Sequence, residues 1–128
     1  MSGFVVDTSA WVDFFAGRPV RGLAEALESG VVALPPVVVA ELVSGARREV
    51  QRRAIADLVA DLPVCDTPLA HWIAVGELRR SAAEQGIAVS TPDAHVARCA
   101  LDRAAILLSR DKVFERIAAL SGLEVWSG

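Results

Sequence analysis

Phe4-Val5-Val6-Asp7-Thr8-Ser9 is the stretch of the chain on which the fold prediction rests. Its three apolar residues predict a short strand, and a carboxylate and two hydroxyls follow at the carboxyl end. A strand that is apolar at every position, rather than at alternate positions, is typical of a parallel sheet covered on both faces. Polar residues that follow such a strand lie at the edge where open α/β sheets bind their ligands.

Short apolar runs alternate with helical stretches along the rest of the chain. The patterns predict strands at 4–6, 31–34, 63–65, 105–108 and 123–126, and helices at 9–16, 19–29, 35–43, 47–61, 68–85, 92–103 and 112–120. This alternation predicts an α/β fold with a mostly parallel central sheet of about five strands flanked by helices. A length of 128 residues fits a single domain spanning 1–128.

The apolar residues of the helix predicted at 68–85 are expected to face the core. They are Leu69, Trp72, Ile73 and Leu78.

Composition excludes several classes of protein. Hydrophobic residues make up 53% of the chain, which excludes intrinsic disorder, and the net charge of −3 excludes a polybasic nucleic-acid binder. Two cysteines, Cys65 and Cys99, form neither a CxxC motif nor a disulfide framework, so a reducing cytoplasm is expected. The longest charge-free stretch, at 29–40, contains two prolines and is shorter than the roughly 20 residues that span a membrane.

Four carboxylates stand in otherwise apolar surroundings. Asp7 and Asp111 each follow a predicted strand, whereas Asp93 and Glu41 lie on helices able to lean over the same edge. Taken singly, Asp7 and Asp111 are explained as helix N-caps, and Asp93 as a partner of a helix dipole. Taken together, four carboxylates repel one another unless a cation lies among them. Oxygen-only ligands suit Mg²⁺, with Mn²⁺ as a substitute, and such a site supports hydrolysis of phosphodiesters by a metal-activated water.

Glu41 shares a predicted helix face with Val37 and Val38, four and three positions before it. A carboxylate on an apolar face needs either an arginine partner or a metal ion, and both explanations stay open. Arg110 and Lys112 flank the fourth carboxylate and are expected to contact substrate phosphates. The arginine-rich run at 47–53 is interpreted as a solvated helix face.

Four short motifs resemble those of the PIN-domain ribonucleases, in particular the small VapC-type toxins of bacterial toxin–antitoxin modules. The motifs are Val5-Val6-Asp7-Thr8-Ser9, Val39-Ala40-Glu41-Leu42, Thr91-Pro92-Asp93-Ala94-His95-Val96-Ala97 and Leu108-Ser109-Arg110-Asp111-Lys112-Val113-Phe114. Their order and spacing match over essentially the whole chain. The resemblance implies a Mg²⁺- or Mn²⁺-dependent endoribonuclease whose catalytic, metal-binding residues are Asp7, Glu41, Asp93 and Asp111.

Further expectations come from the same resemblance. Ser9 would orient a ligand or a water near the metal. The protein would form a homodimer and bind a cognate antitoxin, through which alone it would contact DNA. Val113 departs from the family, whose members often carry an acidic residue there that would serve a second metal position. His95 also stands apart and is interpreted as a surface or hydrogen-bonded histidine, and His71 as structural.

Other classes of protein remain as alternatives. A receiver-like signalling domain has similar length and acidic residues, with Asp66 as its phosphoacceptor, but Asp7 lacks the acidic neighbour that such domains pair with it. A PIN fold that only binds, without activity, is the second alternative. A phosphatase with an aspartyl nucleophile is set aside because Ser9 stands where that mechanism needs an acidic residue.

Overall fold

The computed structural model describes residues 3–127, so the two ends of the predicted domain lie outside the described residues. The strands are β1 (Phe4–Val6), β2 (Val32–Ala33), β3 (Ile106–Leu108) and β4 (Val125–Trp126). The helices are α1 (Thr8–Phe15), α2 (Leu23–Ser29), α3 (Pro36–Gly45), α4 (Glu49–Asp61), α5 (Leu69–Glu84), α6 (Thr91–Asp102) and α7 (Val113–Ser121). The predicted α/β fold is confirmed.

The sheet is parallel, and its strands run in the order β2-β1-β3-β4. In the register of β1 and β3, Val6 pairs with Leu108, so both strands end at the same level. The chain leaves β1 toward β2 on one side and later returns to β3 on the other. Open α/β sheets bind ligands beyond the carboxyl ends of their strands at such a change of direction.

The strand predicted at 63–65 is reduced to a single parallel bridge between Leu34 and Val64. Two backbone hydrogen bonds of 2.8 Å hold it, from Leu34 N–H to the Pro63 carbonyl and from Cys65 N–H to the Leu34 carbonyl. Pro63 has no N–H to donate, which limits the ladder. The described sheet therefore has four strands rather than about five.

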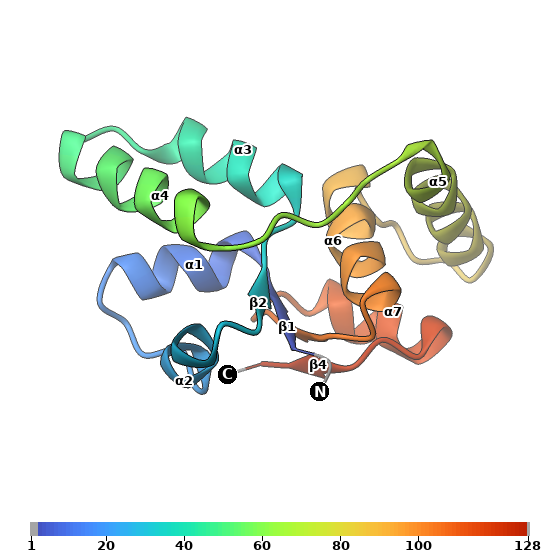
Figure 1. Ribbon diagram of the computed structural model, residues 1–128. Helices are drawn as coiled ribbons and strands as arrows, with labels where there is room; N and C mark the ends of the chain where they lie inside the picture. Colours follow the sequence, from blue (N-terminus) through green and yellow to red (C-terminus); the bar gives the residue numbers. More distant parts are fainter. Residues whose placement is uncertain (1–2, 128) are drawn as a thin grey trace.

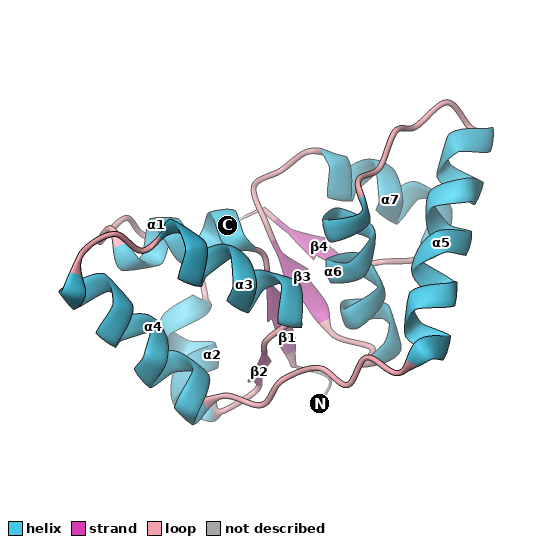
Figure 2. Cartoon of the chain, turned by 90° about the horizontal axis from the view of Figure 1, so that it is seen from above, coloured by secondary structure: helices cyan, strands magenta, loops and turns pink. Residues whose placement is uncertain are grey.

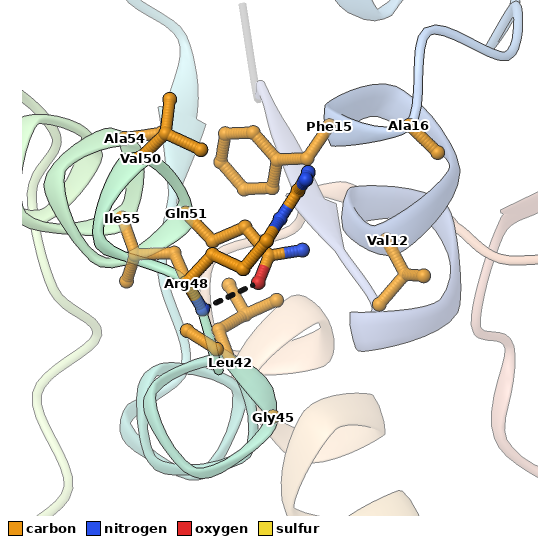
Figure 3. Close-up of a pocket in the computed structure, with 11 residues that line it drawn as sticks. Val12, Phe15, Ala16, Leu42, Gly45, Arg48, Val50, Gln51, Ala54 and Ile55 are labelled. Carbon is orange, nitrogen blue, oxygen red and sulfur yellow. Dashed lines mark hydrogen bonds between the residues drawn. The ribbon is translucent and has the colours of Figure 1, made fainter.

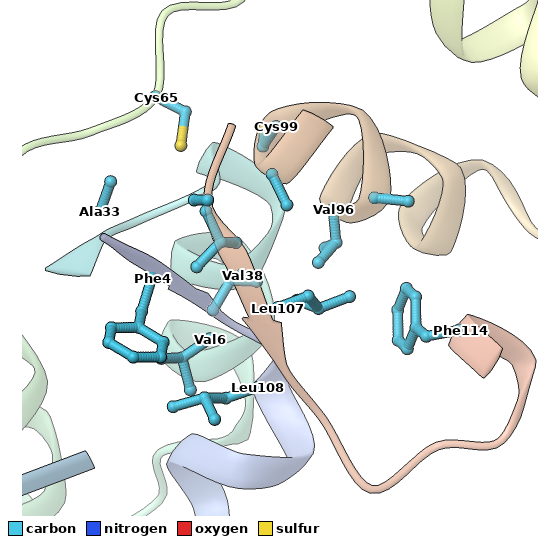
Figure 4. Packing of buried hydrophobic residues seen from close by; sticks show 14 of the residues in the cluster. Phe4, Val6, Ala33, Val38, Cys65, Val96, Cys99, Leu107, Leu108 and Phe114 are labelled. Atoms are coloured by element: carbon cyan, nitrogen blue, oxygen red, sulfur yellow. The ribbon is translucent and has the colours of Figure 1, made fainter. Parts of the chain in front are cut away.

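Helices cover the sheet on both sides (Figures 1 and 2). Helices α1 and α2 lie on one side, while α6 and α7 lie on the other with α5 packed outside α6. Figure 4 shows Val96 of α6 and Phe114 of α7 on the side of β3 toward which Leu107 points. Successive strand residues point to opposite faces, so Leu107 and Leu108 are both buried, each in its own layer.

Helix boundaries agree with the prediction to within two residues, except for α2. That helix was expected from residue 19 but begins at Leu23, because Gly22 before it has a positive φ of 82°. A left-handed residue interrupts helical hydrogen bonding and favours glycine. Within residues 3–127, none of the helices is both long and apolar enough to cross a bilayer.

The prediction for the buried face of α5 was wrong. Leu69, Trp72 and Ile73 are exposed, with 75%, 40% and 56% of their surface accessible. Leu78 alone of the predicted set is buried, and it lies on the face that packs against α6. That face is formed by His71, Val75, Leu78 and Ala82. The spacing of four, three and four is helical. A search for apolar residues alone missed this face because its first residue is a histidine.

Candidate active site

Asp7 is the first residue after β1 and the N-cap of α1, and its side chain is buried. Its Oδ1 accepts the Thr8 N–H at 2.8 Å, and its Oδ2 accepts the hydroxyls of Ser9 and Ser109, each at 2.9 Å. Burial raises the pKa of Asp7 and the charge of Asp111 adds to the rise, whereas these three hydrogen bonds lower it. The N-cap role and a place in the site therefore coexist.

Ser109 follows β3 directly and connects two of the carboxylate residues. Besides donating to Asp7, its hydroxyl accepts the backbone N–H of Asp111 at 3.0 Å. Asp111 Oδ1 in turn accepts the Val113 N–H at 3.0 Å, at the start of α7. Asp111 therefore resembles Asp7: it accepts a hydrogen bond at the start of a helix and also lies near the sheet edge.

Glu41 of α3 is exposed, so the prediction that it shares a buried apolar face was wrong. The buried face of α3 is formed by Val38 and Leu42, which turns Val37 and Glu41 toward the rim. At the rim, Glu41 Oε1 accepts the Thr8 hydroxyl at 2.7 Å. Because Thr8 follows Asp7, this bond places Glu41 beside the first carboxylate.

Asp93 lies in the first turn of α6, where its N–H donates to the Ser90 hydroxyl at 3.2 Å. Burial raises the pKa of its carboxyl, and the charges of Asp111, Asp7 and Glu41 raise it further. The Asp93 carboxylate therefore lies in the field of the other three. The structure brings all four predicted residues to the edge where β1 and β3 end.

The donor set of this edge fits a hard divalent cation. All four side chains offer oxygen, and burial, with a smaller contribution from the neighbouring carboxylates, raises the pKa of Asp7 and Asp93. Mg²⁺ and Mn²⁺ prefer oxygen ligands of this kind. Among residues 3–127, however, only His71, His95 and Cys99 bring three possible ligand atoms close together, within 4.8 Å. The carboxylates lie in a looser arrangement, as expected for like charges.

The two buried histidines form a hydrogen bond with each other rather than a metal site. His71 Nε2 and His95 Nδ1 are 2.7 Å apart. Two nitrogen ligands of one tetrahedral zinc, at about 2.0–2.1 Å from the metal, would stand roughly 3.3 Å apart. Of the two interpretations open for His95, the hydrogen-bonded one holds, and the side chain is fully buried. His71 is buried within the α5–α6 contact, as a structural residue would be.

Comparison with known proteins is decisive for the family. The family sequence model of the PIN domain matches residues 4–120 of this chain. The chain belongs to the PIN domain family. The receiver-like alternative is thereby excluded, and no curated protein matches this PIN domain in sequence at a significant level.

Solved structures with the same fold include toxin–antitoxin proteins. VapBC2 of Rickettsia felis, bound to promoter DNA, has a TM-score of 0.77 and 22% identity over 96% of each chain. VapBC-1 of nontypeable Haemophilus influenzae has a TM-score of 0.77 and 23% identity over 96% of each chain. VapBC-5 of Mycobacterium tuberculosis has a TM-score of 0.73 and 25% identity over 98% of each chain.

The two basic residues near the site of this PIN domain differ in their surroundings. The Arg110 guanidinium lies 3.0 Å from Asp13 Oδ2 and donates to the Pro19 carbonyl at 2.7 Å. Arg18 reaches the other oxygen of Asp13 at 2.9 Å. Lys112 is exposed at the N-cap of α7. Arg110 thus ties the loop after β3 to α1, with fewer donors left for a phosphate.

Two hydroxyl residues of the site were not predicted. Thr8 and Ser109 hold Glu41 and Asp7, and both stand within the quoted motifs. Ser9 was predicted, and its hydroxyl contacts Asp7 itself. A hydroxyl residue close to a carboxylate in sequence could have indicated Thr8 and Ser109 as site residues. The sequence does not show, however, which carboxylate each hydroxyl contacts.

A groove of about 520 Å³ lies between α1, α3 and α4. Figure 3 shows Val12 and Phe15 of α1 facing Leu42 of α3 and Val50 and Ile55 of α4 across it. Val12, Phe15 and Val50 are exposed to 49%, 38% and 65%. The lining includes Leu42, the residue after Glu41, but none of the four carboxylates of this PIN domain.

Proposed function

We propose that this PIN domain is a metal-dependent endoribonuclease that acts as the toxin of a toxin–antitoxin pair. The proposal rests chiefly on one observation: Asp7, Glu41, Asp93 and Asp111 meet at the carboxyl ends of β1 and β3. Family membership and the toxin–antitoxin complexes among the similar structures give it further support.

These four carboxylates are the residues that would hold Mg²⁺ or Mn²⁺. When bound, such an ion supplies a Lewis acid for a phosphate oxygen and lowers the pKa of water near it. Asp7 is the most rigid of the four, because three hydrogen bonds fix both of its oxygens. Ser9 therefore acts on the ligand carboxylate itself, as one of the two hydroxyls on Oδ2.

The remaining side chains orient the reactants. Glu41 and Asp111 are exposed, so either is placed to accept a hydrogen bond from the attacking water. Lys112 is the basic residue beside the site whose ammonium faces solvent, and we assign it the contact with substrate phosphate. Arg110 takes a supporting part, because its ion pair with Asp13 fixes the loop that carries Asp111.

Cleavage of end-labelled RNA with Mg²⁺, Mn²⁺ or EDTA tests the proposal. Asp7→Asn keeps the size of the side chain but removes its charge, and we expect it to reduce cleavage at least about a hundredfold. The matched control is Asp57→Asn, at an exposed carboxylate of α4, which should cleave like the wild type. Equal cleavage by Asp7→Asn and the wild type would contradict the assignment.

The product ends distinguish the mechanism. Hydrolysis by water leaves a 5′-phosphate and a 3′-hydroxyl, because the 2′-hydroxyl of the RNA takes no part. Ends with a 2′,3′-cyclic phosphate would overturn this mechanism. If the wild type cleaves none of several structured RNAs and calorimetry detects no binding of Mn²⁺, the PIN fold is a binding module without activity.

An antitoxin segment fits the groove between α1, α3 and α4. Three of the groove's exposed side chains, Val12, Phe15 and Val50, are apolar, which suits the apolar face of a partner helix. The groove is lined by α1, which begins after Asp7, and by α3, which carries Glu41, so an antitoxin segment that extends beyond the groove along these helices would reach the carboxylates. DNA binding would then come only through the antitoxin.

A second copy of the chain fits the exposed face of α5. Leu69, Trp72 and Ile73 form an apolar patch on that helix, and α5 lies on the opposite side of the molecule from α4 (Figures 1 and 2). A large exposed apolar patch marks an interaction surface. Because groove and patch lie apart, one protomer can bind the antitoxin and its own copy together.

A further inference from the structure

His95 connects the two helices that carry Glu41 and Asp93. It belongs to α6, two positions after Asp93, and its Nε2 accepts the backbone N–H of Val37 at 3.4 Å. Val37 lies in the first turn of α3, where its N–H has no carbonyl one turn earlier in the helix to bond to. Pro35 at the N-cap offers no side-chain acceptor, so the imidazole of a neighbouring helix takes that role.

The other side of the His95 ring is also engaged. Cys99 Sγ also lies 3.8 Å from Nε2, and because Nε2 accepts the Val37 N–H we assign the ring proton to Nδ1, which then donates to His71 Nε2 at 2.7 Å. His71 then has its own proton on Nδ1, which faces Asp102 Oδ2 at 3.6 Å. Trp72 stacks on the His95 ring, with centroids 4.7 Å apart and planes 4° from parallel. Contacts on both edges and one face leave the ring a single orientation.

This arrangement bears on the carboxylates through the helices. Glu41 is four residues after Val37, so both lie on one face of α3, one turn apart. A shift of the α3 N-terminus along α6 would therefore move Glu41 relative to Asp93. The Thr8 hydroxyl fixes Glu41 from the side of α1, and the Val37–His95 bond fixes its helix from the side of α6.

We propose that His95 is a positioning residue of the metal site, which ties the first turn of α3 to α6 and thereby sets where Glu41 stands relative to Asp93. The inference rests on the proposed function, because it assumes that these carboxylates share a cation. His95 is fully buried, so it would act through these two helices rather than on the reacting groups.

Two substitutions, each of which keeps a polar atom at the place of only one imidazole nitrogen, separate this role from core packing. In His95→Gln the amide reaches the place of Nε2 and keeps an acceptor for the Val37 N–H. In His95→Asn the shorter amide reaches the place of Nδ1, which keeps a partner for His71 but leaves the Val37 N–H without one. Calorimetry with Mn²⁺ measures the site directly. We expect His95→Gln to bind Mn²⁺ within about twofold of the wild type and His95→Asn about tenfold more weakly.

The outcomes distinguish this inference from the proposed function. Failure of the wild type to bind Mn²⁺ would overturn both. Binding by the wild type together with equal affinities of His95→Gln and His95→Asn would overturn the positioning role alone. A second measurement needs no variant: ¹⁵N spectra of the imidazoles should show His95 protonated at Nδ1 and bare at Nε2. Protonation at Nε2 would overturn the inference even if neither variant folds.

Discussion

The Ser109 hydroxyl donates a hydrogen bond of 2.9 Å to Asp7 Oδ2, across 102 positions of the sequence. The Ser109 hydroxyl oxygen also accepts the Asp111 N–H at 3.0 Å, so one hydroxyl connects Asp7, which follows β1, with Asp111 in the loop after β3. This contact exists because the two strands are parallel neighbours in register. Ser109 is buried, so a water molecule does not readily take the place of its hydroxyl.

Ser109→Ala should therefore weaken both the site and the fold. We expect Mn²⁺ affinity to fall about tenfold, because a ligand carboxylate loses a fixed donor. The free energy of unfolding should fall by about 1–2 kcal/mol, because one buried and one partly buried hydrogen bond are lost. Calorimetry and urea denaturation measure the two effects. The control is Ser29→Ala, whose hydroxyl bonds only to its own helix; an equal effect there would contradict the role of Ser109.

Asp93→Asn should leave the metal-free protein as stable as the wild type or slightly more stable, by up to about 1 kcal/mol. Its carboxylate is half-buried and repelled by three others, and the substitution removes that repulsion. The stabilisation that Mn²⁺ gives the wild type should disappear. Thermal unfolding with and without Mn²⁺ measures both. A marked loss of stability without metal would mean that Asp93 serves α6 through its charge at the helix start.

Mn²⁺ affinity should fall as the pH is lowered from neutral. Burial raises the pKa of Asp7 and Asp93 above the ordinary value of 3.8, so protons compete with the cation over a higher pH range than usual. Without metal, the same two groups contribute most stability below pH 3.8, and lose that contribution as the pH rises through the raised values. Calorimetry over this range checks the first trend and denaturation the second. A metal affinity independent of pH would contradict the assignment.

Ile73→Glu should convert a dimer into monomers. The substitution places a charge in the middle of the apolar α5 patch, which would cost at least about tenfold in dimer affinity. Light scattering over a range of concentrations measures the change. Glu77→Gln, at an exposed position of the same helix, is the control. A wild type that is already monomeric at all concentrations would show that α5 does not bind a second copy.

Phe15→Glu should weaken binding of the cognate antitoxin without reducing RNA cleavage. The side chain lines the groove but takes no part in the contacts of Asp7, Thr8 or Glu41. Titration of the antitoxin against cleavage by both proteins measures the inhibition constant. Inhibition equal to that of the wild type would place the antitoxin elsewhere.

Which face of a helix is buried could not be predicted where that face contains a histidine, as on α5, or where adjacent residues are all apolar, as on α3. On α5 the buried face begins with His71, and the apolar residues Leu69 and Ile73 are exposed. Whether a histidine is buried depends on a partner, here His95, that lies 24 positions away in the chain. On α3 the same limit applied to Glu41, because Val37 and Val38 are adjacent residues and only one of them lies in the core.

The sequence by itself determined the order of the helices and of the four strands, the family, and the place of the four carboxylates near strand ends and on helices, because these depend on local patterns: apolar runs, caps and residues that follow strands. Only the tertiary structure decided that Ser109 holds Asp7, that Arg110 is paired with Asp13, and that His95 joins α3 to α6. The physical reason is common to all three. Each is a contact between side chains or helix ends far apart in sequence, and its geometry exists only once strand register and helix packing are fixed.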